Sequence, residues 1–228
     1  MRFSFRSELE TDAFFVTEDE PTRLTVNGRE VALSPGGYFL DKCMKKYPIR
    51  VKKGQNRIIL TVPFGVYSRL ENCFVTGSFG VFGKRRFRIA PLPERVSYSS
   101  LTEQGFPFYS GVFTYLTEFD TEAASLSAEY RCRAALLVAR IKGNAKPAET
   151  PVWGAPYAAR LETAPGKGTL ETDCYITQEN AFGLIHVRDR YRRTDSPRLY
   201  NSLHPAHFTA LYGLRPTGLA EPPRLTAK

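Results

Sequence analysis

The chain has 228 residues, enough for one large domain or two of ordinary size, and a formal net charge of +9. Hydrophobic residues make up 42% and aromatic residues 13%, which excludes general disorder, while 17 Gly and 16 Pro favour short strands and frequent turns. No apolar run approaches the roughly 20 residues of a membrane-spanning helix, and the opening residues lack a signal-peptide pattern. We therefore expect a cytoplasmic protein with no membrane partner.

The first half of the chain has the side-chain pattern of short antiparallel strands. Four of its segments show the alternation or the apolar run typical of a strand: residues 2–6, 23–26, 58–62 and 70–81. Asn27-Gly28 predicts a tight hairpin turn, because both residues tolerate a positive φ, with residues 30–33 as the returning strand. A second turn is predicted at residues 54–56. Turns of this density favour a β-sandwich.

The second half repeats these features about 110 to 115 residues later. Residues 113–115, 136–144 and 169–176 correspond to residues 3–5, 23–29 and 57–62. A repeat of this length is a whole domain, because solenoid units recur every ~20–50 residues. We therefore predict an all-β protein built from two tandem antiparallel β-sandwiches of jelly-roll type.

The expected domain boundaries follow shifts in composition. Residues 1–82 form the first sandwich, 83–107 a connector with room for one strand, 108–219 the second sandwich and 220–228 a frayed tail. The connector contains a basic cluster and a Pro-Leu-Pro segment. The tail contains Pro222-Pro223, which cannot continue a hydrogen-bonded ladder.

Positive charge is concentrated in clusters, from which we take one candidate basic patch: Lys84, Arg85, Arg86, Arg88, Arg190, Arg192 and Arg193. Binding of a nucleic acid or another polyanion would need such charges on one face, interleaved with exposed aromatic rings. No nucleic-acid-binding motif accompanies them. The preferred interpretation is therefore solvated loops and strand edges, with polyanion binding as an alternative.

The sequence predicts no metal site and no catalytic residue. The four cysteines form no C-x-x-C motif, and Cys132 and Cys174 fall inside strand-like segments, where we expect small buried hydrophobic side chains. His204 and His207 form an H-x-x-H pair without an identifiable third ligand. No G-x-S-x-G motif is present, and no pair of catalytic carboxylates can be inferred from the sequence.

Four segments in order resemble the galactose-binding-like sandwich domains that accompany family-2 glycoside hydrolases. They are V-N-G at residues 26–28 with K-K-G-Q-N-R-I at 52–58, then residues 70–81, 104–115 and 180–186. The second half departs from this pattern, because Gly143-Asn144 inverts the usual Asn-Gly and Gly168 replaces the asparagine of the second Gly-x-Asn turn. The resemblance implies two galactose-binding-like β-sandwiches.

In the resembled bacterial enzymes, the catalytic carboxylates lie on a separate (β/α)₈ barrel of about 250 residues, for which this chain has no room. The resemblance therefore implies a non-catalytic, carbohydrate-associated accessory module that binds glycan weakly or scaffolds a catalytic glycoside hydrolase domain. One alternative is a part of an O-glycosyl hydrolase whose active site is completed by another segment or chain. The resemblance also allows for a structural calcium ion, although the sequence identifies no ligand set, and we expect no other cofactor.

Three aromatic residues are the candidates for carbohydrate binding: Trp153, Tyr157 and Tyr109. Sugar recognition uses an exposed aromatic ring against the apolar face of a pyranose, with polar groups nearby for the hydroxyls. Trp153 and Tyr157 lie in a segment broken by two prolines and a glycine, which predicts a loop. Packing of these rings within or between the sandwiches is the alternative.

Overall fold

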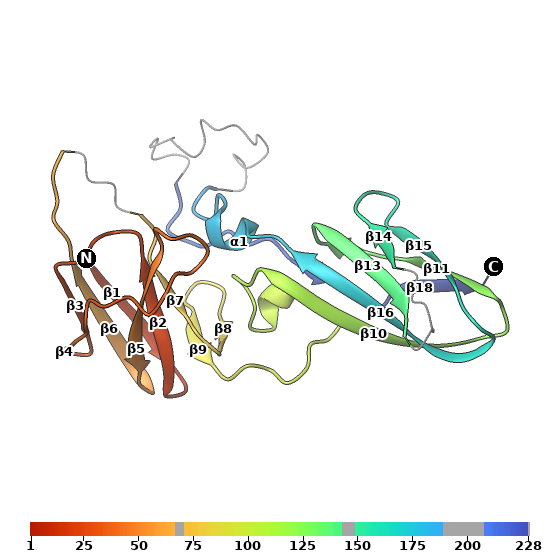
Figure 1. Ribbon diagram of the computed structural model, residues 1–228, viewed down its shortest axis with the longest axis horizontal. Helices are drawn as coiled ribbons and strands as arrows, with labels where there is room; N and C mark the ends of the chain where they lie inside the picture. Colours follow the sequence, from red (N-terminus) through yellow and green to blue (C-terminus); the bar gives the residue numbers. More distant parts are fainter. Residues whose placement is uncertain (67–70, 143–148, 189–207, 228) are drawn as a thin grey trace. The chain divides into compact units, whose positions relative to one another are not determined.

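The computed structural model describes residues 1–66, 71–142, 149–188 and 208–227 (Figure 1). The chain divides into two compact units, Met1–Glu94 and Arg95–Lys228. Across the described part, the helical elements are the 3-10 helix η1 (Leu101–Glu103) and the four-residue helix α1 (Glu179–Phe182), and the other elements are strands. The predicted all-β fold is confirmed.

The first unit is a sandwich of two sheets. A six-stranded sheet has the order β4-β3-β6-β1-β9-β8 and a three-stranded sheet the order β5-β2-β7. The strands are β1 (Arg2–Ser7), β2 (Thr11–Thr17), β3 (Arg23–Val26), β4 (Arg29–Glu30), β5 (Lys45–Val51), β6 (Gly54–Thr61), β7 (Phe74–Thr76), β8 (Gly80–Phe82) and β9 (Arg88–Ala90). Phe15 and Val51 from the smaller sheet pack with Leu24 and Ile58 from the larger one in a single buried cluster.

The second unit is also a sandwich. Its sheets have the orders β10-β16-β13-β14 and β15-β11-β18, and a two-stranded ribbon pairs β12 with β17. The strands are β10 (Gly111–Thr121), β11 (Ser125–Glu129), β12 (Cys132–Arg133), β13 (Leu136–Ile141), β14 (Thr150–Val152), β15 (Ala158–Glu162), β16 (Gly166–Ile176), β17 (Gly218–Leu219) and β18 (Arg224–Ala227). Leu137 and Leu170 from the larger sheet pack with Ala128 and Leu161 from the smaller one.

The two units share one strand plan, which confirms the repeat predicted from the sequence. The order β3-β6-β1 in the first unit matches β13-β16-β10 in the second, and β5-β2-β7 matches β15-β11-β18. Every pairing within these matched sets is antiparallel. At one edge the units also agree, because β4 extends the sheet beyond β3 as β14 extends it beyond β13. They differ at the other edge, where β9 joins β1 as a parallel neighbour in the first unit.

The register shows which residues of the two units are equivalent. Ser7 lies opposite Gly54 at the end of β1, and Thr121 lies opposite Gly166 at the end of β10. Both glycines have positive φ, 97° and 111°, a backbone conformation that side chains with a Cβ rarely adopt. Counting back from these pairs, residues 3–5 correspond to residues 117–119 rather than to the predicted 113–115.

The same strand end carries a matching side-chain turn in both units. The Leu9 backbone N–H donates to Ser7 Oγ at 3.3 Å, and the Ala123 N–H donates to Thr121 Oγ1 at 3.1 Å. Both hydroxyl residues are buried. A short hydroxyl side chain therefore turns the chain from one sheet to the other in each sandwich.

The two asparagines of the V-N-G and K-x-G-x-N segments meet in the first unit. Asn27 Nδ2 donates to Asn56 Oδ1 at 2.9 Å, and the Lys52 backbone N–H donates to the same oxygen at 2.9 Å. Asn56 Nδ2 donates to the Lys52 carbonyl at 2.7 Å, and the Arg57 N–H donates to Asn27 Oδ1 at 2.9 Å. Asn56 is fully buried, so these bonds replace its lost contacts with water.

In the second unit, an aromatic ring fills the space that corresponds to the Asn56 side chain. Phe119 lies opposite Gly168, as Phe5 lies opposite Asn56. A Cβ added at Gly168 would lie 2.3 Å from Phe119 Cζ, so the ring occupies the space of the missing side chain. The glycine at position 168, in place of an asparagine, therefore has a packing reason.

The remaining differences from the expected boundaries concern strands whose partners are distant in sequence. Residues 88–90 of the expected connector form β9 in the first unit's sheet, while Leu101 belongs to the second unit's buried core. Residues 224–227 of the expected frayed tail form β18 and pair with β11.

The sequence pattern does not predict two strands of the first unit, β2 and β5. Pro48 lies in β5 and Pro151 in β14, both edge strands of their sheets.

Asn56→Ala is expected to lower the free energy of unfolding by roughly 2–3 kcal/mol, because it removes the hydrogen bonds that the buried Asn56 side chain makes with Lys52 and Asn27. Urea denaturation followed by circular dichroism measures this change. Asn72→Ala, at an exposed loop position, is the matched control and should leave the midpoint within experimental error. Equal midpoints for the two variants would contradict the proposed role of Asn56.

Candidate carbohydrate-binding face

The outer face of the sheet β10-β16-β13-β14 is built by the two-residue alternation of its strands. In β16, Leu170, Thr172, Cys174 and Ile176 are buried, which leaves Glu171, Asp173 and Tyr175 on the opposite side. In Figure 1, the strands β10, β16 and β13 of this sheet lie side by side. We call this solvent-facing side the outer face of the second unit.

One end of this face is apolar. Tyr175 on β16 lies opposite Val112 on β10 and opposite Leu136 on β13. Tyr175 is 38% exposed and Val112 is 42% exposed. These three residues form a strip across three strands, the apolar row, in which a tyrosine ring stands between two aliphatic side chains.

A charged cluster crosses the same three strands next to the apolar row. Arg140 on β13 donates from Nε to Glu171 Oε2 at 3.0 Å and from Nη1 to Asp173 Oδ2 at 2.7 Å. Thr114 on β10 donates from Oγ1 to Asp173 Oδ1 at 2.6 Å. The side chains of Arg140, Glu171 and Asp173 are between 14% and 22% exposed, so they form a half-buried network. We call these four residues the Arg140 cluster.

Within this cluster, Asp173 and Arg140 stabilise each other's charged forms. Burial alone would raise the pKa of Asp173, but the hydrogen bonds from Thr114 and Arg140 outweigh it and lower that pKa below its ordinary value. The hydrogen bond to Asp173 is the main cause that raises the pKa of the Arg140 guanidinium. A general acid for glycoside hydrolysis needs a raised pKa, so Asp173 is poorly suited to that role.

The apolar row and the Arg140 cluster adjoin each other. Asp173 lies two positions before Tyr175 on β16, and Thr114 lies two positions after Val112 on β10, so their side chains are next neighbours on the same face. A tyrosine ring flanked by aliphatic groups offers a flat apolar surface, and the cluster offers carboxylate acceptors and hydrogen-bond donors beside it. This combination is the one that pyranose recognition requires.

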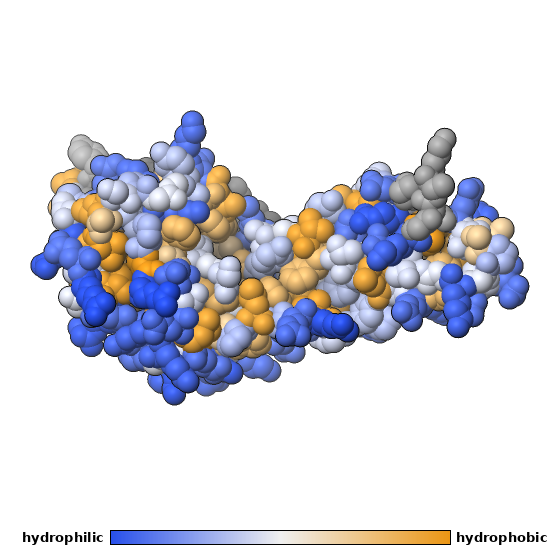
Figure 2. All heavy atoms as spheres, turned by 60° about the horizontal axis from the view of Figure 1, so that its bottom comes forward, coloured by the Kyte–Doolittle hydropathy of each residue, from blue (hydrophilic) through white to orange (hydrophobic). Residues whose placement is uncertain are grey.

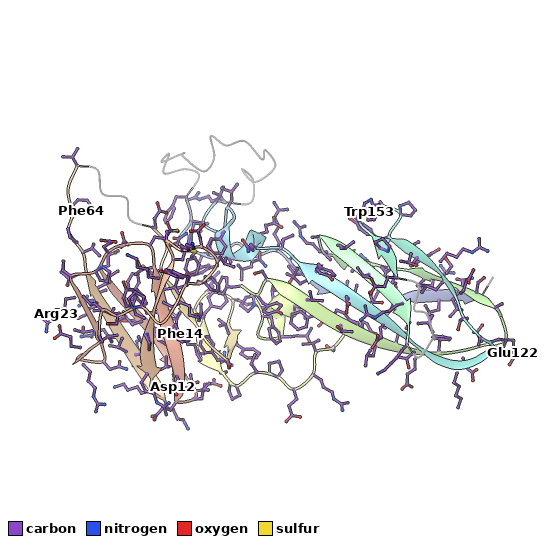
Figure 3. All side chains as sticks on the ribbon, in the orientation of Figure 1. Asp12, Phe14, Arg23, Phe64, Glu122 and Trp153 are labelled. Carbon is purple, nitrogen blue, oxygen red and sulfur yellow. The ribbon has the colours of Figure 1, made fainter. Side chains whose placement is uncertain are left out.

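Trp153 is the predicted sugar-binding residue that lies nearest to this face in the fold. It directly follows β14, whose last residue Val152 lies opposite Leu137 on β13. Trp153 is therefore at the same end of the sheet as the apolar row, and its side chain is 72% exposed in the loop before β15 (Figure 3).

Tyr157 and Tyr109 are placed differently. Tyr157 is half-buried against the core of the second unit, and its carbonyl accepts the Tyr130 N–H at 2.8 Å. Tyr109 makes edge contacts with Phe106 and Phe113 and lies over Gly111, on the core-facing side of β10. The structure therefore does not bring the three predicted aromatics together on one surface.

The candidate basic patch is described only in part. Arg190, Arg192 and Arg193 lie outside the described residues. Lys84, Arg85 and Arg86 are exposed in the loop between β8 and β9. Arg88 forms an ion pair with Glu8, and its guanidinium lies 5.9 Å from the centre of the Phe82 ring. Polyanion binding by the patch stays a prediction.

The structural calcium ion that the resemblance allows for stays a prediction. Within those residues, no group of three or more His, Cys, Asp or Glu side chains could hold a metal ion. The two carboxylates of β16 in the Arg140 cluster are paired with Arg140. His204 and His207 lie outside the described residues, and all four cysteines are free thiols. Burial raises the pKa of Cys174 to about 12.

The comparisons with known proteins do not assign a family. No protein-family model matches the sequence, and no curated protein matches it. A solved structure described as a rhamnosidase, a glycoside hydrolase, from Novosphingobium sp. PP1Y aligns with 98% of this chain at 18% identity, with a TM-score of 0.35. The alignment covers 22% of that chain, so the present protein spans about a fifth of its length. Membership of family 2 stays a prediction.

The described residues include no helix long and apolar enough to span a membrane. The cytoplasmic location stays a prediction.

Sequence reasoning missed the residues that make this face. The alternation over residues 169–176 was a usable signal, because it places Glu171, Asp173 and Tyr175 on one side of a strand. Their partners Arg140 and Thr114 lie on other strands, and only the strand register brings them together.

The stability of the wild type is expected to fall more steeply with acid than that of Asp173→Asn. Because the folded-state pKa of Asp173 is lowered, its stabilisation is present above the unfolded-state pKa and is lost as pH falls towards the folded-state pKa. Thermal unfolding midpoints measured from about pH 5 to about pH 2 test this window. Asp120→Asn, exposed on β10, should keep the wild-type slope. Equal slopes for wild type and Asp173→Asn would refute the expectation.

Proposed function

We propose that this chain is a non-catalytic carbohydrate-binding module whose second unit binds a glycan on its outer face. The observation that carries the proposal is the adjacency of the apolar row to the Arg140 cluster on an open sheet surface. A pyranose ring would stack on Tyr175, and its hydroxyl groups would exchange hydrogen bonds with Asp173, Glu171 and Thr114. An open face of this kind fits an extended chain better than a single buried sugar.

The Arg140 cluster is suited to binding because it is preorganised. Arg140 and Thr114 hold the two carboxylates in place before any ligand arrives, so little side-chain freedom is lost on binding. The carboxylate oxygens keep lone pairs for further donors, because each accepts fewer bonds than it can. Binding is expected to be weak, since an open face leaves much of the ligand in water.

The finer role that we propose is that of an accessory to a catalytic glycoside hydrolase domain. The sequence resemblance to sandwich domains of family-2 enzymes supports this role, and the lowered pKa of Asp173 disfavours acid catalysis by that residue. The protein would then deliver or position glycan for a catalytic barrel. An active site completed by another chain is the competing proposal, and a gain of glycosidase activity on mixing with a candidate partner would favour it.

Tyr175→Ala is expected to weaken binding of a neutral oligosaccharide about fivefold to tenfold, equivalent to roughly 1–1.5 kcal/mol of lost stacking. Chemical-shift titration against a panel of neutral glycans identifies the ligand and maps the surface. Isothermal titration at two salt concentrations then measures affinity, which should change little with salt, because the ligand has no charge.

Tyr38→Ala is the matched control, since Tyr38 is an exposed tyrosine of the first unit at 53% exposure. Trp153→Ala tests whether the neighbouring loop takes part. Shifts confined to residues away from β10, β13 and β16 would overturn the assignment of the face. If no glycan of a broad panel causes chemical shifts, the proposal that the chain binds carbohydrate is wrong.

A further inference from the structure

A second surface with its own chemistry lies on the first unit. The outward positions of β1 are Arg2, Ser4 and Arg6, because Phe3 and Phe5 pack against the core. On β6, the exposed Arg57 lies opposite Ser4. Arg57 is therefore the diagonal neighbour of both Arg2 and Arg6, a relation in which residues of antiparallel strands lie about 7–8 Å apart. We call Arg2, Arg6 and Arg57 the arginine triad.

The triad is extended along the sheet by the neighbouring parallel strand. Arg88 on β9 lies opposite Arg6, and Gln55 on β6 lies on the other side of Arg6. The exposed Arg85 and Arg86 precede Arg88 in the loop between β8 and β9. In Figure 2, which shows one face of the molecule, hydrophilic residues cover much of the first unit around a smaller hydrophobic patch.

The triad has no acidic counterpart among the described residues. Glu8 is bound to Arg88, and Glu30 lies 3.6 Å from Arg23, whereas no described acidic side chain forms an ion pair with Arg2, Arg6 or Arg57. Like charges on neighbouring strands lower stability. A sheet face that gathers uncompensated guanidinium groups is therefore suited to an anionic ligand.

The chemistry of this face selects among anionic ligands. Guanidinium groups bind carboxylates through paired hydrogen bonds, and Ser4 and Gln55 between the arginines offer hydrogen bonds to hydroxyl groups. The outward positions of β1, β3 and β6 carry no aromatic ring, and the Phe82 ring on β8 is already engaged by the Arg88 guanidinium. Single-stranded nucleic acids depend on such rings for base stacking, and a flat multistranded face does not enter a duplex groove.

We infer that the outer face of the first unit, centred on the arginine triad, binds a carboxylated polysaccharide. This site is separate from the neutral-glycan face proposed for the second unit and does not rest on it. Carboxylates spaced along the polymer would pair with Arg2, Arg57 and Arg6 in turn, and the polymer backbone would lie along β1 and β6. The expected affinity depends steeply on salt, because binding releases counterions.

Affinity electrophoresis and isothermal titration of the full chain with polygalacturonate test this inference. We expect binding that weakens markedly between low and physiological salt and that drops about tenfold or more in Arg6→Gln/Arg57→Gln, which removes two charge-assisted contacts. The methyl-esterified polymer, which has the same backbone without the charge, should bind at least about tenfold more weakly for the same reason. The double variant should unfold at the same temperature as the wild type or higher, because it relieves like-charge repulsion.

The matched control is Arg160→Gln/Arg224→Gln, which removes the same charge from exposed positions on the second unit's smaller sheet. An equal loss of binding in this control would show that binding depends on net charge alone, and it would contradict a site at the arginine triad. Equal binding of the esterified polymer would show that the carboxylates are not recognised and would overturn the inference. Tighter binding of an oligothymidylate than of polygalacturonate would show that the preferred ligand is a nucleic acid. Loss of neutral-glycan binding in Tyr175→Ala, with polygalacturonate binding retained, would separate the two faces.

Discussion

The hydrogen bonds of one buried amide set the register on which the first unit depends. Asn56 binds both the turn that precedes it and the Asn27 side chain at the end of β3, so three strands are fixed relative to one another. A slip of β6 by one residue would bring Arg57 into the core and Ile58 to the surface. The outward position of Arg57 in the arginine triad therefore depends on its buried neighbour Asn56.

The second unit meets the same requirement without the amide. The Phe119 ring over Gly168 ties β10 to β16 through packing, which is less directional than the hydrogen bonds by which Asn56 ties β6 to the end of β3 in the first unit. Further along the same pair of strands, this register places Asp173 beside Thr114 and Tyr175 beside Val112. Two solutions to one local problem thus support two outer faces of different chemistry.

The sequence predicts a strand well where apolar and polar residues alternate clearly. It predicts a strand poorly where charged residues obscure that alternation. β1, β3, β6, β13 and β16 follow from their patterns. In β5, Tyr47, Ile49 and Val51 point inward, but Lys45, Lys46 and Pro48 give the segment the composition of a basic loop. The Arg140 cluster lay beyond prediction for another reason: it joins residues of three strands, and no local pattern encodes which strands become neighbours.

The placement of the two prolines has a consequence for self-association. Pro48 in β5 and Pro151 in β14 stand on strands that end their sheets, where an unpaired row of backbone groups could template intermolecular pairing. A proline offers no N–H at that position and interrupts the row. Each proline thereby limits strand pairing between molecules along one edge of its sheet, and in the first unit the backbone bonds of Gly36 and Gly37 with Lys46 cover part of the same edge.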